Sequence, residues 1–239
     1  MHSATMSAEP AAPPAAGEFY RVNRGGGLFS EAVSQRVGAV LAAVAYRLGV
    51  APTLLTFANL VIGLATSAAV VALASTAVPT WVAGVVALVG WQLAYAFDCA
   101  DGQLARVAGR TSPAGARVDV LCDIAVQISL VTALSAVAVD QRPSTASWVV
   151  ALFVGTWMVN LVTSVMQAGP NAGSMVPSTS LPVRVVKLVR DYGAVIFVAG
   201  LVLLVVPQWT IWLILAFTAV NGAFLLASIL FTSRTALRS

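Results

Sequence analysis

The sequence predicts an all-α, polytopic membrane protein with an N-terminal amphipathic surface helix and six transmembrane helices. Of its 239 residues, 59% are apolar and only 9% are charged, whereas soluble domains carry about 25% charged residues. The apolar residues form long continuous runs rich in Ala, Leu and Val, and the mean hydropathy is +0.90. Transmembrane barrels consist of short alternating strands, so these runs indicate helices. At about 20 residues per span, the chain has room for about six.

The N-terminal region divides into a tail and a helix. Residues 1–28 are rich in Ala and Pro and then in Gly, and we expect a disordered tail. In residues 29–50, apolar side chains recur at helical spacing, with Arg36 and Arg47 among the polar residues between them. This pattern predicts an amphipathic helix on the membrane surface, with a short spanning helix as the alternative.

Six apolar runs follow as candidate spans. They lie at about 54–74, 79–99, 117–138, 147–167, 185–206 and 208–231. Pro79, Pro143 and Pro207 fall in the intervening turns, where helix breakers are expected. We therefore expect one membrane-embedded domain at residues 29–231 and a C-terminal tail at residues 232–239.

The basic residues are distributed unevenly along the chain. All of the 13 Lys and Arg residues except Arg142 fall in four regions that six spans would place on one side of the membrane. These residues are Arg21, Arg24, Arg36 and Arg47, then Arg106, Arg110 and Arg117, then Arg184, Lys187 and Arg190, and finally Arg234 and Arg238. The positive-inside rule assigns that side, and with it both termini and the motif between the second and third spans, to the cytoplasm. We expect the membrane to be the cell membrane, that is, an inner or plasma membrane. Most of these charges serve topology and attraction to lipid headgroups, and we expect no nucleic-acid partner.

Four aspartates lie close together at the junction of the second and third candidate spans. They are Asp98, Asp101, Asp119 and Asp123. The spacings i, i+3 and i, i+4 place each pair on one face of its helix. Because the connecting segment is short, we expect the two helices to be antiparallel neighbours and the four carboxylates to converge. Ionisable groups at membrane depth are costly, so they indicate a functional site.

Four converging carboxylates point to metal chemistry. Such a group needs compensating cations or protons where the dielectric constant is low. Oxygen ligands favour hard ions, and we expect two divalent cations, Mg²⁺ or Mn²⁺. Two-metal sites recur where phosphate esters are made or broken, and Gly102 and Arg106 are suited to the close approach and binding of a phosphate. The residues favour phosphoryl transfer, with a cation or proton transporter as the alternative.

The spacing of these residues also matches a known signature. The segment from Asp98 to Asp123 reads DCADGQLARVAGRTSPAGARVDVLCD and fits D-x2-D-G-x2-A-R-x8-G-x3-D-x3-D at every fixed position. It resembles the signature of the CDP-alcohol phosphotransferase (CDP-alcohol phosphatidyltransferase) family. Members of that family have a surface helix and six spans, with the motif joining the second and third, so the resemblance covers residues 29–231.

The resemblance implies roles for individual residues. The four aspartates would hold the two metals, and Asp123 would also be the base that deprotonates the acceptor hydroxyl. The implied contacts to the CDP group are Gly102, Arg106, Ser112, Thr53, Leu54, Leu55 and Thr56. Asn59, in the span close to the last of these, is a candidate supporting residue.

The resemblance also implies a reaction. A phosphatidyl group would pass from a CDP-linked lipid, CDP-diacylglycerol, to a hydroxyl of a small polar alcohol with release of CMP, in phospholipid biosynthesis. Some relatives instead transfer a phospho-alcohol from soluble CDP-choline or CDP-ethanolamine to a lipid acceptor, and this alternative stays open. Family members are commonly homodimers, and we expect a homodimer here.

The identity of the acceptor is not predicted. Arg184, Lys187 and Arg190, spaced i, i+3 and i+6, lie on the expected cytoplasmic side and are candidates to bind a phosphate-bearing acceptor, with anchoring to lipid headgroups as the alternative. Relatives that make phosphatidylinositol phosphate or phosphatidylglycerol phosphate often carry a Lys-x-Arg pair near the end of the fourth span. This chain reads SVMQAGPNAGSM there instead, which indicates a different acceptor pocket.

Overall fold

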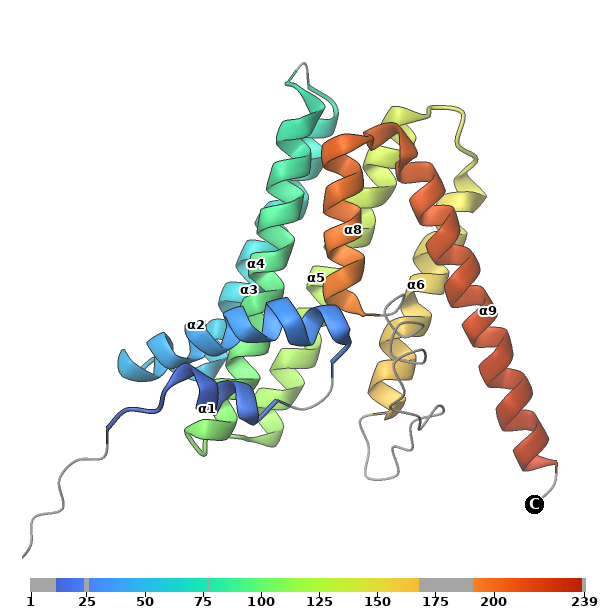
Figure 1. Ribbon diagram of the computed structural model, residues 1–239. Coiled ribbons are helices and arrows are strands. Elements are labelled where there is room, and N and C mark those ends of the chain that lie inside the picture. Colours follow the sequence, from blue (N-terminus) through green and yellow to red (C-terminus); the bar gives the residue numbers. More distant parts are fainter. Residues whose placement is uncertain (1–11, 24–25, 77, 168–190, 238–239) are drawn as a thin grey trace, which may run out of the picture.

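The computed structural model describes residues 12–23, 26–76, 78–167 and 191–237, and these ranges are helical without a strand (Figure 1). In chain order the elements are α1 (Ala16–Arg21), η1 (Ser30–Ser34, a π-helical turn), α2 (Gln35–Arg47), α3 (Pro52–Ala74), α4 (Thr80–Val107), α5 (Pro113–Gln141), α6 (Ser147–Gln167), α8 (Tyr192–Val205), η3 (Pro207–Trp209, a 3₁₀ turn) and α9 (Thr210–Ala236). Pro52 and Pro113 begin α3 and α5, where the missing N–H costs no helical hydrogen bond.

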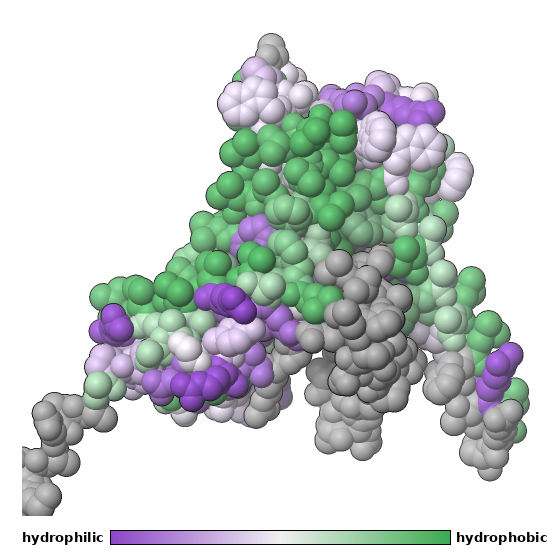
Figure 2. Space-filling model, in the orientation of Figure 1, coloured by the Kyte–Doolittle hydropathy of each residue, from purple (hydrophilic) through white to green (hydrophobic). Residues whose placement is uncertain are grey.

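Among the described residues, four helical segments are long and apolar enough to cross a membrane. They are α3, α4, α5 and the segment Pro207–Leu230, and shorter apolar stretches occupy Ser147–Val159 of α6 and Tyr192–Val205 of α8. Figure 2 shows the apolar surface as a band with polar residues at both ends. The chain is therefore an all-helical membrane protein, and the count of six spans stays a prediction.

Helix α3 is the centre of the helical packing around the aspartates. It packs extensively against both α4 and α5, whereas α4 and α5 make few direct contacts with each other. The two helices, which we expected to be neighbours, meet through their side chains, since Asp98 of α4 lies against Asp119 and Asp123 of α5, while α3 packs closely against the backbones of both. Small residues allow the close approach: a Cβ atom added to Gly63 of α3 would lie 2.7 Å from Cγ1 of Val126 in α5.

A second layer of contacts completes the bundle. Helix α8 packs along α4, and α6 pairs with α9. Buried residues from each of these helices form one apolar cluster, in which the largest side chains are Trp91, Leu130, Leu134, Phe153, Trp157, Ile196, Leu203 and Ile214. This cluster joins α3, α4, α5, α6, α8 and α9.

Helix α1 lies inside the region expected to be a disordered tail, and that expectation is wrong for Ala16–Arg21. Phe19 is fully buried and packs edge-on against Tyr46 at a centroid distance of 5.8 Å. It joins a second apolar cluster with Ala42 of α2 and Leu104 of α4. The Ala and Pro residues around this segment hide the pattern of a helix that is only six residues long.

Helix α2 has two distinct faces and runs across the bundle instead of along it (Figure 1). Its alanines, among them Ala39, Ala42 and Ala43, are buried against the protein. The opposite face, with its η1 extension, exposes a row of larger side chains: Val33, Val37, Val40, Val44 and Leu48. The small residues thus form the packing face, and the large apolar residues point outward.

Candidate metal and active site

Two helices supply the acidic side chains of the site. Asp98 and Asp101 lie in the last three turns of α4, and Asp119 and Asp123 lie in the first three turns of α5. Ser112 begins α5 as its N-cap, accepting a hydrogen bond from the amide of Gly115 at 3.0 Å. The chain therefore turns between α4 and α5 at one end of the bundle. As it returns, it brings Asp119 and Asp123 level with Asp98 and Asp101.

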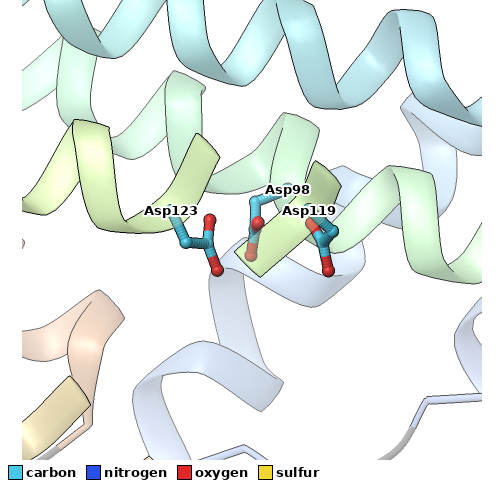
Figure 3. A group of neighbouring side chains, drawn as sticks. All are labelled: Asp98, Asp119 and Asp123. Carbon is cyan, nitrogen blue, oxygen red and sulfur yellow. The ribbon is translucent and has the colours of Figure 1, made fainter. Parts of the chain in front are cut away.

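Three of the four carboxylates meet at one point. Each of Asp98, Asp119 and Asp123 offers an oxygen that lies within 4.8 Å of the oxygens offered by the other two. Figure 3 shows their side chains projecting from α4 and α5 into a shared space. All three are partly buried. Side chains from two helices thus form one oxygen-rich site even though the helices make few direct contacts.

Asn59 of α3 bridges the two helices that carry the aspartates. Its side-chain nitrogen donates to Oδ1 of Asp98 at 3.4 Å and to Oδ1 of Asp123 at 3.3 Å. Asn59 is 2% exposed. An amide donor that is held inside the bundle orients both carboxylates and offsets part of their mutual repulsion.

Asp101 is placed differently from the other three aspartates. It is buried, and its Oδ2 accepts a hydrogen bond from the hydroxyl of Thr56, also in α3. It is not part of the group of three whose oxygens lie within 4.8 Å. Three carboxylates therefore meet at one point, and Asp101, one turn further along α4, joins them through a side-chain hydrogen bond with Asp119.

The donor set fits a divalent cation. Among the described residues, Oδ1 of Asp119 is buried without a hydrogen-bond partner, which is costly unless another group satisfies it. Three clustered carboxylates repel one another unless positive charge lies between them. Their ligand atoms are all oxygens, as Mg²⁺ and Mn²⁺ prefer. The acidic cluster could therefore bind such an ion.

Gly102 and Arg106 form the next feature along α4. A Cβ atom added to Gly102 would lie 3.1 Å from one terminal nitrogen of Arg106 and 3.2 Å from the other. The guanidinium group therefore lies directly over the bare backbone of Gly102, one residue beyond Asp101. The missing side chain of Gly102 thus leaves room for a fixed positive charge beside the carboxylates, and a guanidinium group is suited to binding phosphate.

The remaining residues predicted to contact the substrates lie in different environments. Of the stretch after Pro52, Thr53 and Leu54 are exposed, Leu55 is buried in the N-terminal cluster, and Thr56 reaches Asp101. The Ser112 hydroxyl is exposed and caps α5. The predicted acceptor residues lie outside the described residues: Arg184, Lys187 and Arg190.

A cavity of about 240 Å³ adjoins the acidic cluster. Its polar lining comes from Asp98 and Asp123 together with Asn59, Tyr95, Gln127 and Tyr192, and Trp91, Ala94 and Val126 complete it. Trp157 donates to Oε1 of Gln127 at 3.1 Å, so the NH₂ group of Gln127 is turned away from that contact. The cavity therefore offers phenol and amide groups next to the carboxylates.

The sequence was compared with models of known protein families and with curated proteins. A family model described as CDP-alcohol phosphatidyltransferase matches residues 49–230. The chain belongs to the CDP-alcohol phosphatidyltransferase family. A search of curated proteins gave no match. Membership in this family of transferases agrees with the resemblance seen in the motif and favours phosphotransfer from a CDP-alcohol over ion transport.

Sequence reasoning missed part of the surroundings of this CDP-alcohol phosphatidyltransferase site. Tyr95 and Tyr192 line the cavity, yet aromatic residues at span ends are usually explained by the membrane interface. Gln127 lies inside a candidate span, where hydrogen bonding between helices is the usual explanation for an amide side chain. The sequence does hold one signal: Tyr95 lies three residues before Asp98, and Gln127 lies four residues after Asp123, so each shares a helix face with an aspartate of the site.

Proposed function

We propose that this protein is a metal-dependent transferase that moves a phosphatidyl group from CDP-diacylglycerol to a hydroxyl of a small polar alcohol and releases CMP. The observation that carries the proposal is the meeting of the Asp98, Asp119 and Asp123 carboxylates within 4.8 Å, in a chain of the CDP-alcohol phosphatidyltransferase family. The reaction would serve phospholipid biosynthesis.

In this proposal, Asp98, Asp101, Asp119 and Asp123 hold two divalent cations, Mg²⁺ or Mn²⁺. When bound, such ions stabilise negative charge on phosphoryl oxygens and favour the ionised form of an attacking hydroxyl. The unpartnered Oδ1 of Asp119 and the Asn59 hydrogen bonds support this assignment. Asn59 would not bind the metal itself but would orient Asp98 and Asp123, as residues hydrogen-bonded to metal ligands do at many sites.

The nucleotide half of the donor would bind at the open end of α4. Arg106 would pair with the phosphates, and Gly102, which has no side chain, gives its guanidinium group room beside the helix. Thr56 keeps Asp101 in place through its hydroxyl. Ser112 and the exposed Thr53 and Leu54 lie at the ends of their helices, where CDP would enter from water.

The acceptor would bind in the cavity beside Asp123. Asp123 takes the proton of the acceptor hydroxyl, and the acceptor oxygen forms a bond to the phosphorus that carries the diacylglycerol. The bond from that phosphorus to the oxygen bridging to CMP breaks, and CMP leaves with the electron pair. The phenol and amide groups of Tyr95, Gln127 and Tyr192 suit the remaining hydroxyls of a polar alcohol. Arg184, Lys187 and Arg190 are part of this proposal as acceptor contacts.

The placement in the membrane belongs to the same proposal. The outward row of valines on α2 would lie in the lipid interface, with α2 as a surface helix and both termini in the cytoplasm. The carboxylates then face the cytosol, so the nucleotide stays in water while the acyl chains remain in the bilayer. We propose six spans in a cell membrane and a homodimeric assembly.

The experiment is CMP release by the purified full-length protein in detergent. CDP-diacylglycerol, Mg²⁺ or Mn²⁺ and a panel of acceptor alcohols are supplied to wild type, to Asp123→Asn and to Asp140→Asn. The last variant makes the same change at an exposed position at the other end of α5. We expect metal-dependent release that needs one acceptor, falls at least about 100-fold in Asp123→Asn and is unchanged in Asp140→Asn.

Two outcomes would redirect the proposal. Release only with CDP-choline or CDP-ethanolamine and a lipid acceptor would reverse which substrate carries the CDP group. No release with any donor, in protein shown to be folded, would refute the transferase activity.

A further inference from the structure

Asp191 is a buried carboxylate that the proposed reaction does not use. It is 4% exposed. Its Oδ2 accepts the backbone N–H groups of Phe29 at 2.8 Å and of Ser30 at 3.0 Å, and its Oδ1 accepts the N–H of Gly193 at 3.1 Å and the hydroxyl of Ser30. One side chain thus caps the start of α8 and the start of the η1–α2 segment, which are separated by about 160 residues of sequence.

The hydroxyl of Ser30 continues this network to the cavity. Its Oγ lies 3.0 Å from the hydroxyl oxygen of Tyr95. Tyr95 lies in α4 one turn before Asp98, and its ring packs edge-on against Tyr192 at a centroid distance of 5.0 Å. Both tyrosines line the cavity with Asp98 and Asp123. The part of the cavity wall formed by Tyr95 and Tyr192 is therefore connected to Asp191 by hydrogen bonds and a ring contact.

Gln92 of α4 forms hydrogen bonds with both α8 and the η1–α2 segment near Asp191. Its Nε2 donates to the carbonyl of Gly193 at 2.8 Å, and its Oε1 accepts from Ser34 at 3.4 Å. The packing leaves little room, because a Cβ atom added to Gly193 would lie 2.8 Å from Oγ of Ser30 and 3.1 Å from Cε1 of Tyr95. Any shift of η1 relative to α8 would consequently be transmitted to Tyr95.

We infer that Asp191 is a positioning residue for the transfer reaction: it holds Ser30 against Tyr95 and thereby fixes the Tyr95–Tyr192 wall of the acceptor cavity. This inference rests on the proposed function, because it assigns the cavity to the acceptor alcohol. It makes the N-terminal η1–α2 segment a part of the active site's structure, although that segment contributes no cavity-lining residue.

Three substitutions in the full-length protein test the role: Asp191→Ala, Ser30→Ala and Tyr95→Phe. Hydrogen exchange, read by mass spectrometry on the peptide containing Phe29 and Ser30, reports the Asp191 contacts without any activity. The KM for the acceptor and kcat come from the CMP-release assay. Ser228→Ala removes a serine hydroxyl that bonds only its own helix, at 2.8 Å from the carbonyl of Phe224, and serves as the control.

We expect Asp191→Ala to accelerate exchange at Phe29 and Ser30 and to raise the acceptor KM about tenfold, since it removes hydrogen bonds to a charged acceptor. Asp191→Asn, which keeps one oxygen acceptor, gives a smaller rise. Tyr95→Phe should raise the acceptor KM about fivefold with exchange unchanged. Ser30→Ala combined with Tyr95→Phe should raise KM by less than the product of the single effects, because both remove the same hydrogen bond.

The contrary results are separable. If exchange in Asp191→Ala equals that of wild type, the contacts of Asp191 do not hold the segment and the inference fails alone. If exchange rises while the acceptor KM stays constant in Asp191→Ala, Ser30→Ala and Tyr95→Phe, Asp191 serves folding only. If wild type releases no CMP with any donor, the proposed function fails and the positioning role fails with it, whatever the exchange data give.

Discussion

The close approach of α3 and α5 gives a quantitative prediction for Gly63→Ala. The added methyl carbon would lie 2.7 Å and 2.9 Å from the two Cγ atoms of Val126, whereas carbon atoms in ordinary contact lie about 3.5–4.0 Å apart. The two helices must therefore separate by several tenths of an ångström. Gly63 is one turn from Asn59, and Val126 is one turn from Asp123, so the separation acts directly on the Asn59–Asp123 hydrogen bond.

Two effects of the substitution oppose each other. Overpacking of this kind costs about 1–3 kcal/mol of unfolding free energy, and replacing glycine by alanine inside a helix returns up to about 1 kcal/mol. We expect a net loss of about 1–2 kcal/mol. For a chain of this length, each kcal/mol lowers the midpoint of thermal unfolding by about 2–4 °C.

The assay is thermal unfolding in detergent together with CMP release. Val126→Ala removes both clashing carbons, so the double variant Gly63→Ala/Val126→Ala should be more stable than the sum of the two single losses predicts, by at least about 0.5 kcal/mol. Gly155→Ala in α6, where an added Cβ meets nothing within 4 Å, is the matched control: it should raise the unfolding free energy by up to about 1 kcal/mol, the helix-propensity gain alone, and leave CMP release unchanged. Strict additivity in the double variant would refute the argument that this contact limits the spacing of α3 and α5.

Three further predictions concern the polar groups of the site. Asn59→Leu should weaken Mn²⁺ binding about tenfold in a titration followed by electron paramagnetic resonance, since residues that orient metal ligands commonly contribute this much; unchanged affinity would contradict the bridging role. Thr56→Val should lower the unfolding free energy by about 1–3 kcal/mol, because buried Asp101 loses its hydroxyl donor, and Thr56→Ser should restore most of it. Mn²⁺ at 100 times its Kd should stabilise wild type by about 2.7 kcal/mol, and this gain should disappear in Asp119→Asn; an equal gain in both would mean that the ion binds elsewhere.

Much of the site could be predicted because helical spacing fixes which residues share a face. The intervals between Asp98 and Asp101 and between Asp119 and Asp123 set each pair on one side of its helix, and the structure brings three of these residues together. The breaks expected at Pro79 and Pro207 coincide with the starts of α4 and η3. These features depend on local sequence alone.

The remaining features depend on contacts between distant segments. The apolar run that predicts α3 does not say which helices it meets, so Asn59, which bridges Asp98 and Asp123, could only be a candidate supporting residue. The hydroxyl donor of Asp101, Thr56, is likewise a tertiary partner that local sequence does not identify. Asp191 gave no signal, because a single aspartate before an apolar run is typical of any helix N-cap.

The hydrogen-bond donors of α3 also bear on how the protein is made. Thr56 and Asn59 precede in the chain every carboxylate to which they donate, Asp101, Asp98 and Asp123. Synthesis proceeds from the N-terminus, so α3 enters the bilayer before the acidic helices do. Asp98, Asp101 and Asp123, which arrive where an unpaired charge is costly, then each meet a donor that is already in place. The order of the helices along the chain thus lowers the barrier to inserting acidic segments into lipid.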